Sequence, residues 1–181
     1  FEGTTGDFAA IQRDVAAAIG HAIQLRLRPE DRRRLAERAT IDPATYELYL
    51  RGMHAMRRVQ DGGNAAEGLR YLRQAIDRDP GDPHAYAGLA KGYVALGHSP
   101  AAPEDAWING REAAERALTL APDLADAHAA MAEVKLYYEW DWDGAQRAFR
   151  RANELNPNLC QNHYHYSWYL YLRDRMDEAI A

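Results

Sequence analysis

The chain has 181 residues, enough for one domain, and a formal net charge of −5, which does not favour general binding to nucleic acid. Its single cysteine excludes an internal disulfide and a cysteine-rich zinc site, and no apolar run approaches the ~18 residues of a membrane-spanning helix. We therefore expect neither nucleic-acid binding nor a membrane span within this chain. Because residue 1 is Phe1 rather than Met, we expect a piece of a longer protein, with a cytoplasmic location favoured and a periplasmic one if a membrane span lies upstream.

Residues 1–43 are predicted to form helices that precede the rest of the domain. Apolar residues recur at helical spacing over 8–25, with Asp7 as a candidate N-cap, and Pro29 begins a second, shorter helix that ends before Pro43. The segment either caps the domain or remains from an upstream domain. Capping is favoured because an uncovered terminal helix pair would expose its apolar face.

From residue 44 onward the chain repeats a pattern of small residues around the three prolines Pro80, Pro122 and Pro157. A small residue stands twelve before, five before and ten after each proline: Gly68, Ala75, Ala90; Gly110, Ala117, Ala132; Ala145, Ala152, Ser167. Antiparallel helices approach closely where such residues face each other, and proline ends a helix. The pattern therefore predicts consecutive helical hairpins, with Met53 at the small position of a looser first copy.

The spacing between the prolines also predicts extra residues between the two helices of each hairpin. In the first copy these fall near 60–63, in the second over 97–105, and in the third one residue falls beside Trp140-Asp141-Trp142. The two Trp either form an exposed contact site or fold their rings back over the junction between repeats. The second alternative is favoured because exposed Trp pairs are costly, and we expect Asp141 or Asp143 to cap the following helix.

This pattern resembles the tetratricopeptide repeat, a helix–turn–helix unit of about 34 residues. The best copies read HAYAGLAKGYVALG with GREAAERALTLAP, and ADAHAAMAEVKLYYEWDWDGAQRAFRRANELNP. The resemblance implies an all-α fold: a right-handed α-solenoid of helical hairpins with N-terminal capping helices. The expected repeats span 44–82, 83–124, 125–159 and 160–181, the last truncated.

In this family the first helix of each hairpin lines a concave groove, so the resemblance implies that a protein or peptide segment binds there. The expected partner-binding residues are His54, Arg57, Arg58, Lys91, Tyr137, Tyr164, Trp168 and Tyr171. An acidic part of the partner would lie near the basic residues and an apolar part near Trp168 and Tyr171. Alternatively, the aromatic residues pack against a further repeat or against a mate in a homo-oligomer. The Lys/Asn clamp of the chaperone-tail form is not predicted, because Leu50 and His54 hold its first two places.

No catalytic motif is found in the sequence. Phosphate-binding loops, glycine-rich dinucleotide turns and the hydrolase and metalloprotease signatures are all missing from it. His163 and His165 stand two apart, on different faces of a helix, with no cysteine or carboxylate at ligand spacing. We therefore predict no catalytic residue, no cofactor, no metal site and no enzymatic activity in this chain.

Three runs, PATYELYLRGMHAMRR, YLRQAIDRDPGDPHAYAGLA and KLYYEWDWDGAQRAFRRANELNPN, resemble the repeat region of bacterial winged-helix transcriptional regulators or adenylate/guanylate cyclases. The resemblance implies an interaction or regulatory module of a larger bacterial signalling or transcription-regulatory protein. The alternatives are an oligomerisation scaffold and an accessory domain of a nucleotide cyclase.

Overall fold

The computed structural model describes residues 14–15, 42–57, 65–99 and 104–180. Within those ranges the fold is all-α, as predicted, and contains no strand. The predicted N-terminal capping helices lie outside the described residues, apart from Asp14 and Val15, which are helical. The elements in chain order are α3 (Pro43–Arg57), α4 (Ala65–Arg78), α5 (Pro83–Gly97), α6 (Ala106–Leu120), α7 (Ala125–Val134), the π-helical turn η3 (Lys135–Glu139), α8 (Trp142–Leu155), α9 (Cys160–Leu172) and α10 (Met176–Ala179).

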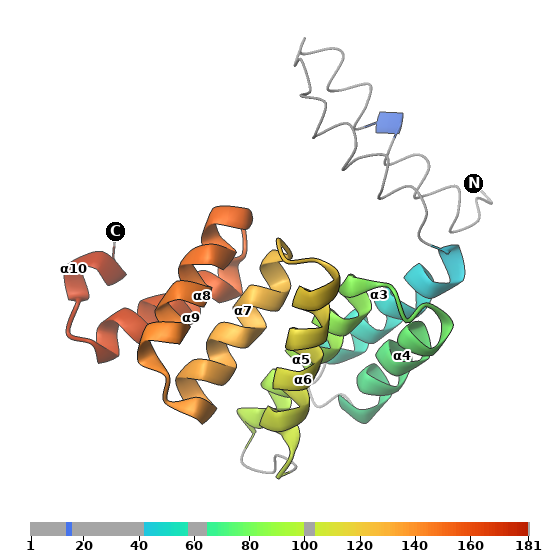
Figure 1. Ribbon diagram of the computed structural model, residues 1–181, viewed down its shortest axis with the longest axis horizontal. Helices are drawn as coiled ribbons and strands as arrows, with labels where there is room; N and C mark the ends of the chain where they lie inside the picture. Colours follow the sequence, from blue (N-terminus) through green and yellow to red (C-terminus); the bar gives the residue numbers. More distant parts are fainter. Residues whose placement is uncertain (1–13, 16–41, 58–64, 100–103, 181) are drawn as a thin grey trace.

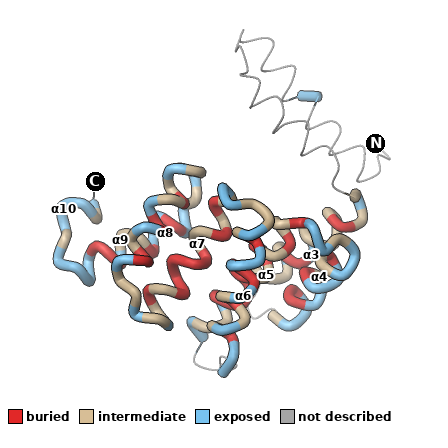
Figure 2. Tube along the Cα trace, viewed as in Figure 1, coloured by how far each residue is buried: buried red, intermediate tan, exposed pale blue. Residues whose placement is uncertain are grey.

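The helices form hairpins that follow one another along the long axis of the molecule (Figure 1). Helix α3 pairs with α4, α5 with α6 and α7 with α8, and each second helix also packs on the first helix of the next hairpin. The chain bends at each of the three prolines, between α4 and α5, α6 and α7, and α8 and α9. Buried stretches recur on α3 to α9, whereas α10 is largely exposed (Figure 2).

The repeated alanines are buried where the helices meet. Those five residues before each proline are fully buried, as are Ala90 and Ala132. Two histidines close turns, because the Nε2 atoms of His128 and His163 lie 2.8 Å from the carbonyl oxygens of Pro122 and Pro157, respectively, each six residues earlier. The sequence pattern therefore marks both the helix contacts and the turns.

The first hairpin differs from its predicted register by one residue. Its close approach lies between Gly52 and Gly68: a Cβ atom added at Gly52 would lie 3.2 Å from the carbonyl oxygen of Gly68. Gly110 meets the backbone of Ala90 at the equivalent place in the second hairpin. Gly52 therefore holds the small position that the sequence assigned to Met53, and the side chains of α3 that face inward shift with it.

The extra residue predicted in the third repeat is absorbed by η3, which ends α7 with a wider turn. A π turn accommodates one more residue than an ordinary α-helical turn. The turn closes at Trp140, which has a left-handed backbone with φ of 57°, and the Asp141 N–H donates to the carbonyl oxygen of Lys135 at 2.9 Å.

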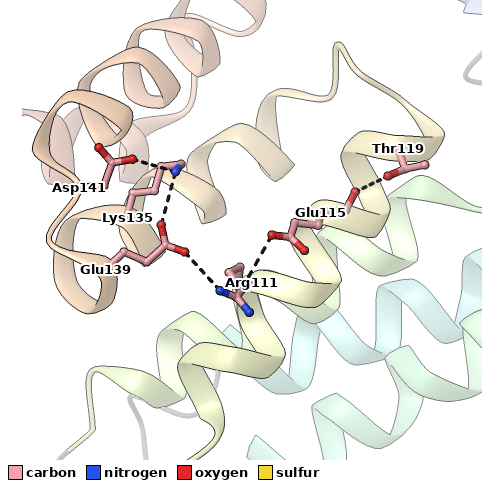
Figure 3. Close-up of polar contacts among 6 residues, drawn as sticks. All are labelled: Arg111, Glu115, Thr119, Lys135, Glu139 and Asp141. Atoms are coloured by element: carbon pink, nitrogen blue, oxygen red, sulfur yellow. Dashed lines mark hydrogen bonds and ion pairs between the residues drawn. The ribbon is translucent and has the colours of Figure 1, made fainter.

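A chain of charged side chains joins η3 to its neighbours (Figure 3). The Lys135 Nζ atom lies 2.9 Å from Asp141 Oδ2 and 3.4 Å from Glu139 Oε2, and Glu139 Oε1 lies 3.7 Å from an Nη1 of Arg111 on α6. The ammonium of Lys135 and the Gly144 N–H hold the pKa of Asp141 below its usual range. The network thus ties the wide turn to α6 and to the beginning of α8.

The two tryptophans at this turn have different environments, although both were expected to fold inward. Trp142 packs on the core formed by α8 and α9, with its ring 6.1 Å from that of Tyr169. Trp140 is 67% exposed. The expectation is therefore met by Trp142 and was wrong for Trp140.

Asp141 caps α8 and is expected to stabilise the fold. Its Oδ1 atom accepts a hydrogen bond from the Gly144 N–H at 2.8 Å. We expect Asp141→Ala to lower the free energy of unfolding by about 1 kcal/mol in urea denaturation, a typical value for a lost N-cap. Because Lys135 and the Gly144 N–H depress the folded pKa of Asp141, the stabilisation by the charged carboxylate is present at neutral pH and is lost as the pH falls from about 4 through the folded pKa.

Asp143→Ala is the control, because Asp143 lies in the same helical turn but is not the capping residue. Its loss should cost only the smaller interaction with the helix dipole, about 0.3 kcal/mol. Equal losses for the two variants would show that charge, and not the cap, carries the effect.

No helix within the described ranges has both the length and the apolar character needed to cross a membrane.

Candidate functional site

The first helices of the hairpins form one layer of the molecule. Helix α3 packs on α5 and α5 packs on α7, and Glu133 of α7 contacts His165 of α9. Side chains of α3, α5, α7 and α9 that point away from the second helices therefore share an inner face. With Gly52 at the small position of α3, the residue following it in each helix is Met53, Lys91, Glu133 and Trp168.

At the start of this inner face, an ion pair bridges two neighbouring hairpins. The Lys91 Nζ atom of α5 lies 2.9 Å from Asp126 Oδ1 of α7. Tyr49 of α3 lies close by, and burial together with the negative charges of Asp126 and Asp82 raises its pKa to about 12. The charge of Lys91 is thus already partnered by Asp126 within the domain.

Further along, two histidines and a glutamate from three hairpins meet. The Glu133 Oε2 atom lies 3.0 Å from His98 Nε2 and 3.1 Å from His165 Nε2. Glu133 is 5% exposed and His165 8% exposed, whereas His98 lies at the end of α5 with a more open side chain. We call these three residues the His–Glu–His cluster.

Aromatic side chains surround the His–Glu–His cluster and orient its rings. The Trp107 ring packs against Gly97, where an added Cβ would lie 2.5 Å from it, and meets His98 edge-on at 5.0 Å between centroids. The Tyr137 hydroxyl lies 3.1 Å from His165 Nδ1, and its ring also meets His98 edge-on at 4.7 Å. Glycine at position 97 is therefore needed for Trp107 to approach and position His98. Burial and the charge of Glu133 raise the pKa of Tyr137.

The far end of the inner face carries exposed aromatic residues of α9. Tyr164 is 70% exposed, Trp168 44% and Tyr171 52%, and the rings of Trp168 and Tyr171 stack at 5.3 Å. Large exposed apolar side chains that lie together commonly mark a contact surface. The aromatic end predicted for the inner face is therefore accessible in the structure.

The structure separates the predicted partner-binding residues into groups. Tyr137 lies in the His–Glu–His surroundings, while Tyr164, Trp168 and Tyr171 share α9. Arg57 is exposed at the end of α3 and Arg58 lies outside the described residues. His54 is exposed, but the corrected register moves it away from the inner-face positions.

Sequence reasoning missed the His–Glu–His cluster because it looked for ligands near His165 along one helix. Glu133 directly follows the small position Ala132, whereas His165 lies two residues before the small position Ser167, so the repeat pattern places them at different positions of the first helix. His98 belongs to the long connection after α5, whose course no repeat pattern specifies.

Solved structures share this arrangement of helices. The chain superposes on a thermophilic TPR protein of Thermus thermophilus with a TM-score of 0.62 at 19% identity, covering 96% of this chain and 86% of that one. The fold is that of a tetratricopeptide repeat (TPR) domain. The TPR domain of Sgt2 from Aspergillus fumigatus gives a TM-score of 0.58 at 19% identity, covering 76% of this chain and 83% of that one. The first TPR of Spaghetti, bound to an HSP90 peptide, gives 0.55 at 15% identity, covering 72% and 94%.

Curated relatives are distant. The transcriptional regulator HilA of Salmonella typhimurium is 23% identical over 151 residues, which cover 83% of this chain, so the chain spans about a quarter (27%) of that protein. Hsp70-Hsp90 organizing protein 2 of Arabidopsis thaliana is 27% identical over 92 residues, which cover 51% of this chain and 14% of that protein. No family model matches the chain.

Proposed function

We propose that this TPR domain is a protein-interaction module that binds a peptide segment of a partner on its inner face. The observation that carries the proposal is the row of exposed aromatic residues Tyr164, Trp168 and Tyr171 on α9. Aromatic side chains supply most of the binding energy in many interfaces. The Spaghetti domain, whose helices follow the same course, binds a peptide.

The inner face favours a partner segment that is mainly apolar. Asp126 already pairs with the charge of Lys91 within the domain. Of the Arg and Lys residues that were predicted to bind the partner, Arg57 is exposed and lies within the described ranges, so it can bind an acidic group of the partner. In the corrected register Tyr49 and Met53 hold the first two places of the chaperone-tail clamp. Neither side chain is a cation or an amide, so a chaperone C-terminal carboxylate is not the proposed ligand.

The domain is proposed to serve a larger bacterial regulatory protein. The similarity to HilA covers most of this chain but only 27% of that regulator, which leaves room for an output domain elsewhere in such a protein. In this arrangement the repeats recruit or sense, and no chemical step is assigned to them. A second candidate function, self-association, is favoured by exposed apolar residues that continue from Leu172 to Met176 and Ile180 of α10 and its flank.

A displayed library of random peptides tests the proposal. Peptides selected on the whole chain are expected to contain an apolar or aromatic core, and their affinity is measured by fluorescence anisotropy. Trp168→Ala should weaken binding about thirtyfold, because an aromatic anchor of an interface contributes about 2 kcal/mol. Ile108→Ala, an exposed apolar residue on the second helix α6, should leave the affinity unchanged.

Selected peptides that bind the Trp168→Ala variant as tightly as the original chain would contradict the proposal. Light scattering at several protein concentrations distinguishes self-association from peptide binding. A concentration-dependent dimer that dissociates in Trp168→Ala, in a chain that selects no peptide, would assign the aromatic surface of α9 to self-association.

A further inference from the structure

We propose that His98, Glu133 and His165 form a binding site for a divalent transition-metal ion of the Zn²⁺ class. The inference is independent of peptide binding, because it rests on different residues and chemistry. Imidazole nitrogens and a carboxylate oxygen are the ligands that zinc commonly takes in proteins.

The three potential ligand atoms already lie close together. Both histidine Nε2 atoms contact the same oxygen of Glu133, at 3.0 and 3.1 Å, and all ligand atoms lie within 4.8 Å of one another. Two ligands of a tetrahedral zinc ion, at bond lengths of about 2.1 Å, lie about 3.4 Å apart, so each pair of ligand atoms must approach by at most about 1.4 Å.

One of the two histidine rings must rotate to bind an ion, and the exposure of the two side chains indicates which one. The His98 and His165 rings are nearly parallel, 16° between planes and 5.5 Å between centroids, so an ion in the plane of both requires one of them to turn. The His98 side chain is 35% exposed at the end of α5, whereas the His165 side chain is 10% exposed within α9. His98 can therefore close the site onto a fixed Glu133–His165 pair.

The buried charge of Glu133 also favours a cation at this position. Carboxylates are costly to bury without a positive partner. A divalent ion would supply the positive charge and take the neutral Nε2 as a ligand.

Tyr137 supports the tautomer that metal binding needs. Metal-bound histidines usually donate their second ring N–H to a nearby acceptor, which fixes the orientation of the ring. The Tyr137 hydroxyl lies 3.1 Å from His165 Nδ1, so it can accept the Nδ1 proton once an ion replaces the contact between Nε2 and Glu133. Tyr137 is thus a positioning residue for the site.

Two imidazoles and one carboxylate limit which metal ions suit the site and how such an ion would be coordinated. Without a thiolate among the three ligands, zinc, nickel, cobalt and copper(II) suit the site better than copper(I). Three protein ligands leave one position of a tetrahedral ion for water or for an incoming group. That position would be reached from the side of His98, the most open of the three residues.

The test is calorimetric titration of the whole, chelator-stripped chain with zinc sulfate, supported by the visible absorption of bound Co²⁺. We expect one zinc ion per chain and the absorption bands of tetrahedral cobalt. Glu133→Gln and His98→Ala should each weaken zinc binding by at least about tenfold, and Tyr137→Phe by about tenfold, as for other orienting residues.

His163→Ala is the matched control, since this exposed histidine lies two residues from His165 on the same helix and bonds to a backbone carbonyl. It should bind zinc as the original chain does. Circular dichroism verifies folding, and if Glu133→Gln loses its helices, His98→Ala at the open end of α5 decides the question. A chain that binds less than one zinc ion, or binding that His98→Ala leaves unchanged, would overturn the proposal.

Discussion

The Gly52→Ala variant is expected to be about 2 kcal/mol less stable than the Gly110→Ala variant, although both add one methyl group to a helix. The added Cβ at position 52 would lie 2.6 Å from Leu72 Cγ, and Leu72 is completely buried. Its Cγ is held in the core, so the helices α3 and α4 must separate. Overpacking of this kind costs about 1–3 kcal/mol.

A methyl group added at Gly110 would make less severe contacts than one added at Gly52. Its nearest neighbour is Val94 Cγ2 at 3.3 Å, and the backbone of Ala90 lies 3.6 Å away. Both variants gain about 1 kcal/mol of helix propensity, so this gain cancels in the comparison and the difference reports the contact alone.

Urea denaturation measures the difference, and hydrogen exchange locates it. Because each repeat contacts only its neighbours, faster exchange should be confined mainly to α3, α4 and α5. Equal stability of the two variants would show that Gly52 and Gly68 do not set the approach of the first hairpin, and would return the small position to Met53.

The fold was predictable from the sequence because its determinants are local and repeated. A small residue at a helix crossing and a proline at a turn each act within a few residues, and three copies in register confirm one another. The first copy was placed one residue out because it has Gly52 next to Met53 and a long connection after it. With no equivalent alanine pattern on α3, only the packing against Gly68 decides between the two positions.

The candidate site was predictable only where it follows the repeat. Tyr137, Tyr164, Trp168 and Tyr171 were assigned to the inner face by register alone. The partnering of Lys91 by Asp126 was not, because it depends on how two side chains of neighbouring hairpins reach each other. The His–Glu–His cluster depends in addition on the end of α5, where the chain leaves the repeat pattern.

The wide turn η3 was also only partly predictable from the sequence. Counting residues between prolines places one extra residue beside Trp140, which is next to η3. The count alone allows a longer loop or a wider helical turn. The structure contains the wider helical turn, a π turn. Lys135 forms ion pairs with Glu139 and Asp141 across this turn.

Phe149→Ala is expected to lower the free energy of unfolding by about 3–5 kcal/mol, the largest loss that we predict for a single side chain. Phe149 is fully buried on α8, and its ring lies 5.6 Å from that of Tyr166 and 6.2 Å from that of Tyr169 on α9. Removing a buried phenyl ring costs its transfer from water and leaves a cavity. The loss falls on the junction between α8 and α9.

The loss should therefore also open α9 before the rest of the domain. Hydrogen exchange is expected to rise in α9 and α10 and to change little in α3 and α4, because a repeat array transmits such damage only to its neighbours. Tyr138→Ala, which removes a ring that is 40% exposed, should stay within about 0.5 kcal/mol of the original chain. If α9 keeps its protection in Phe149→Ala, the aromatic contact with α8 is not what holds it. Because α9 carries both His165 and Trp168, its opening is expected to weaken zinc binding and peptide binding together, whereas substitutions within either site should weaken only one of them.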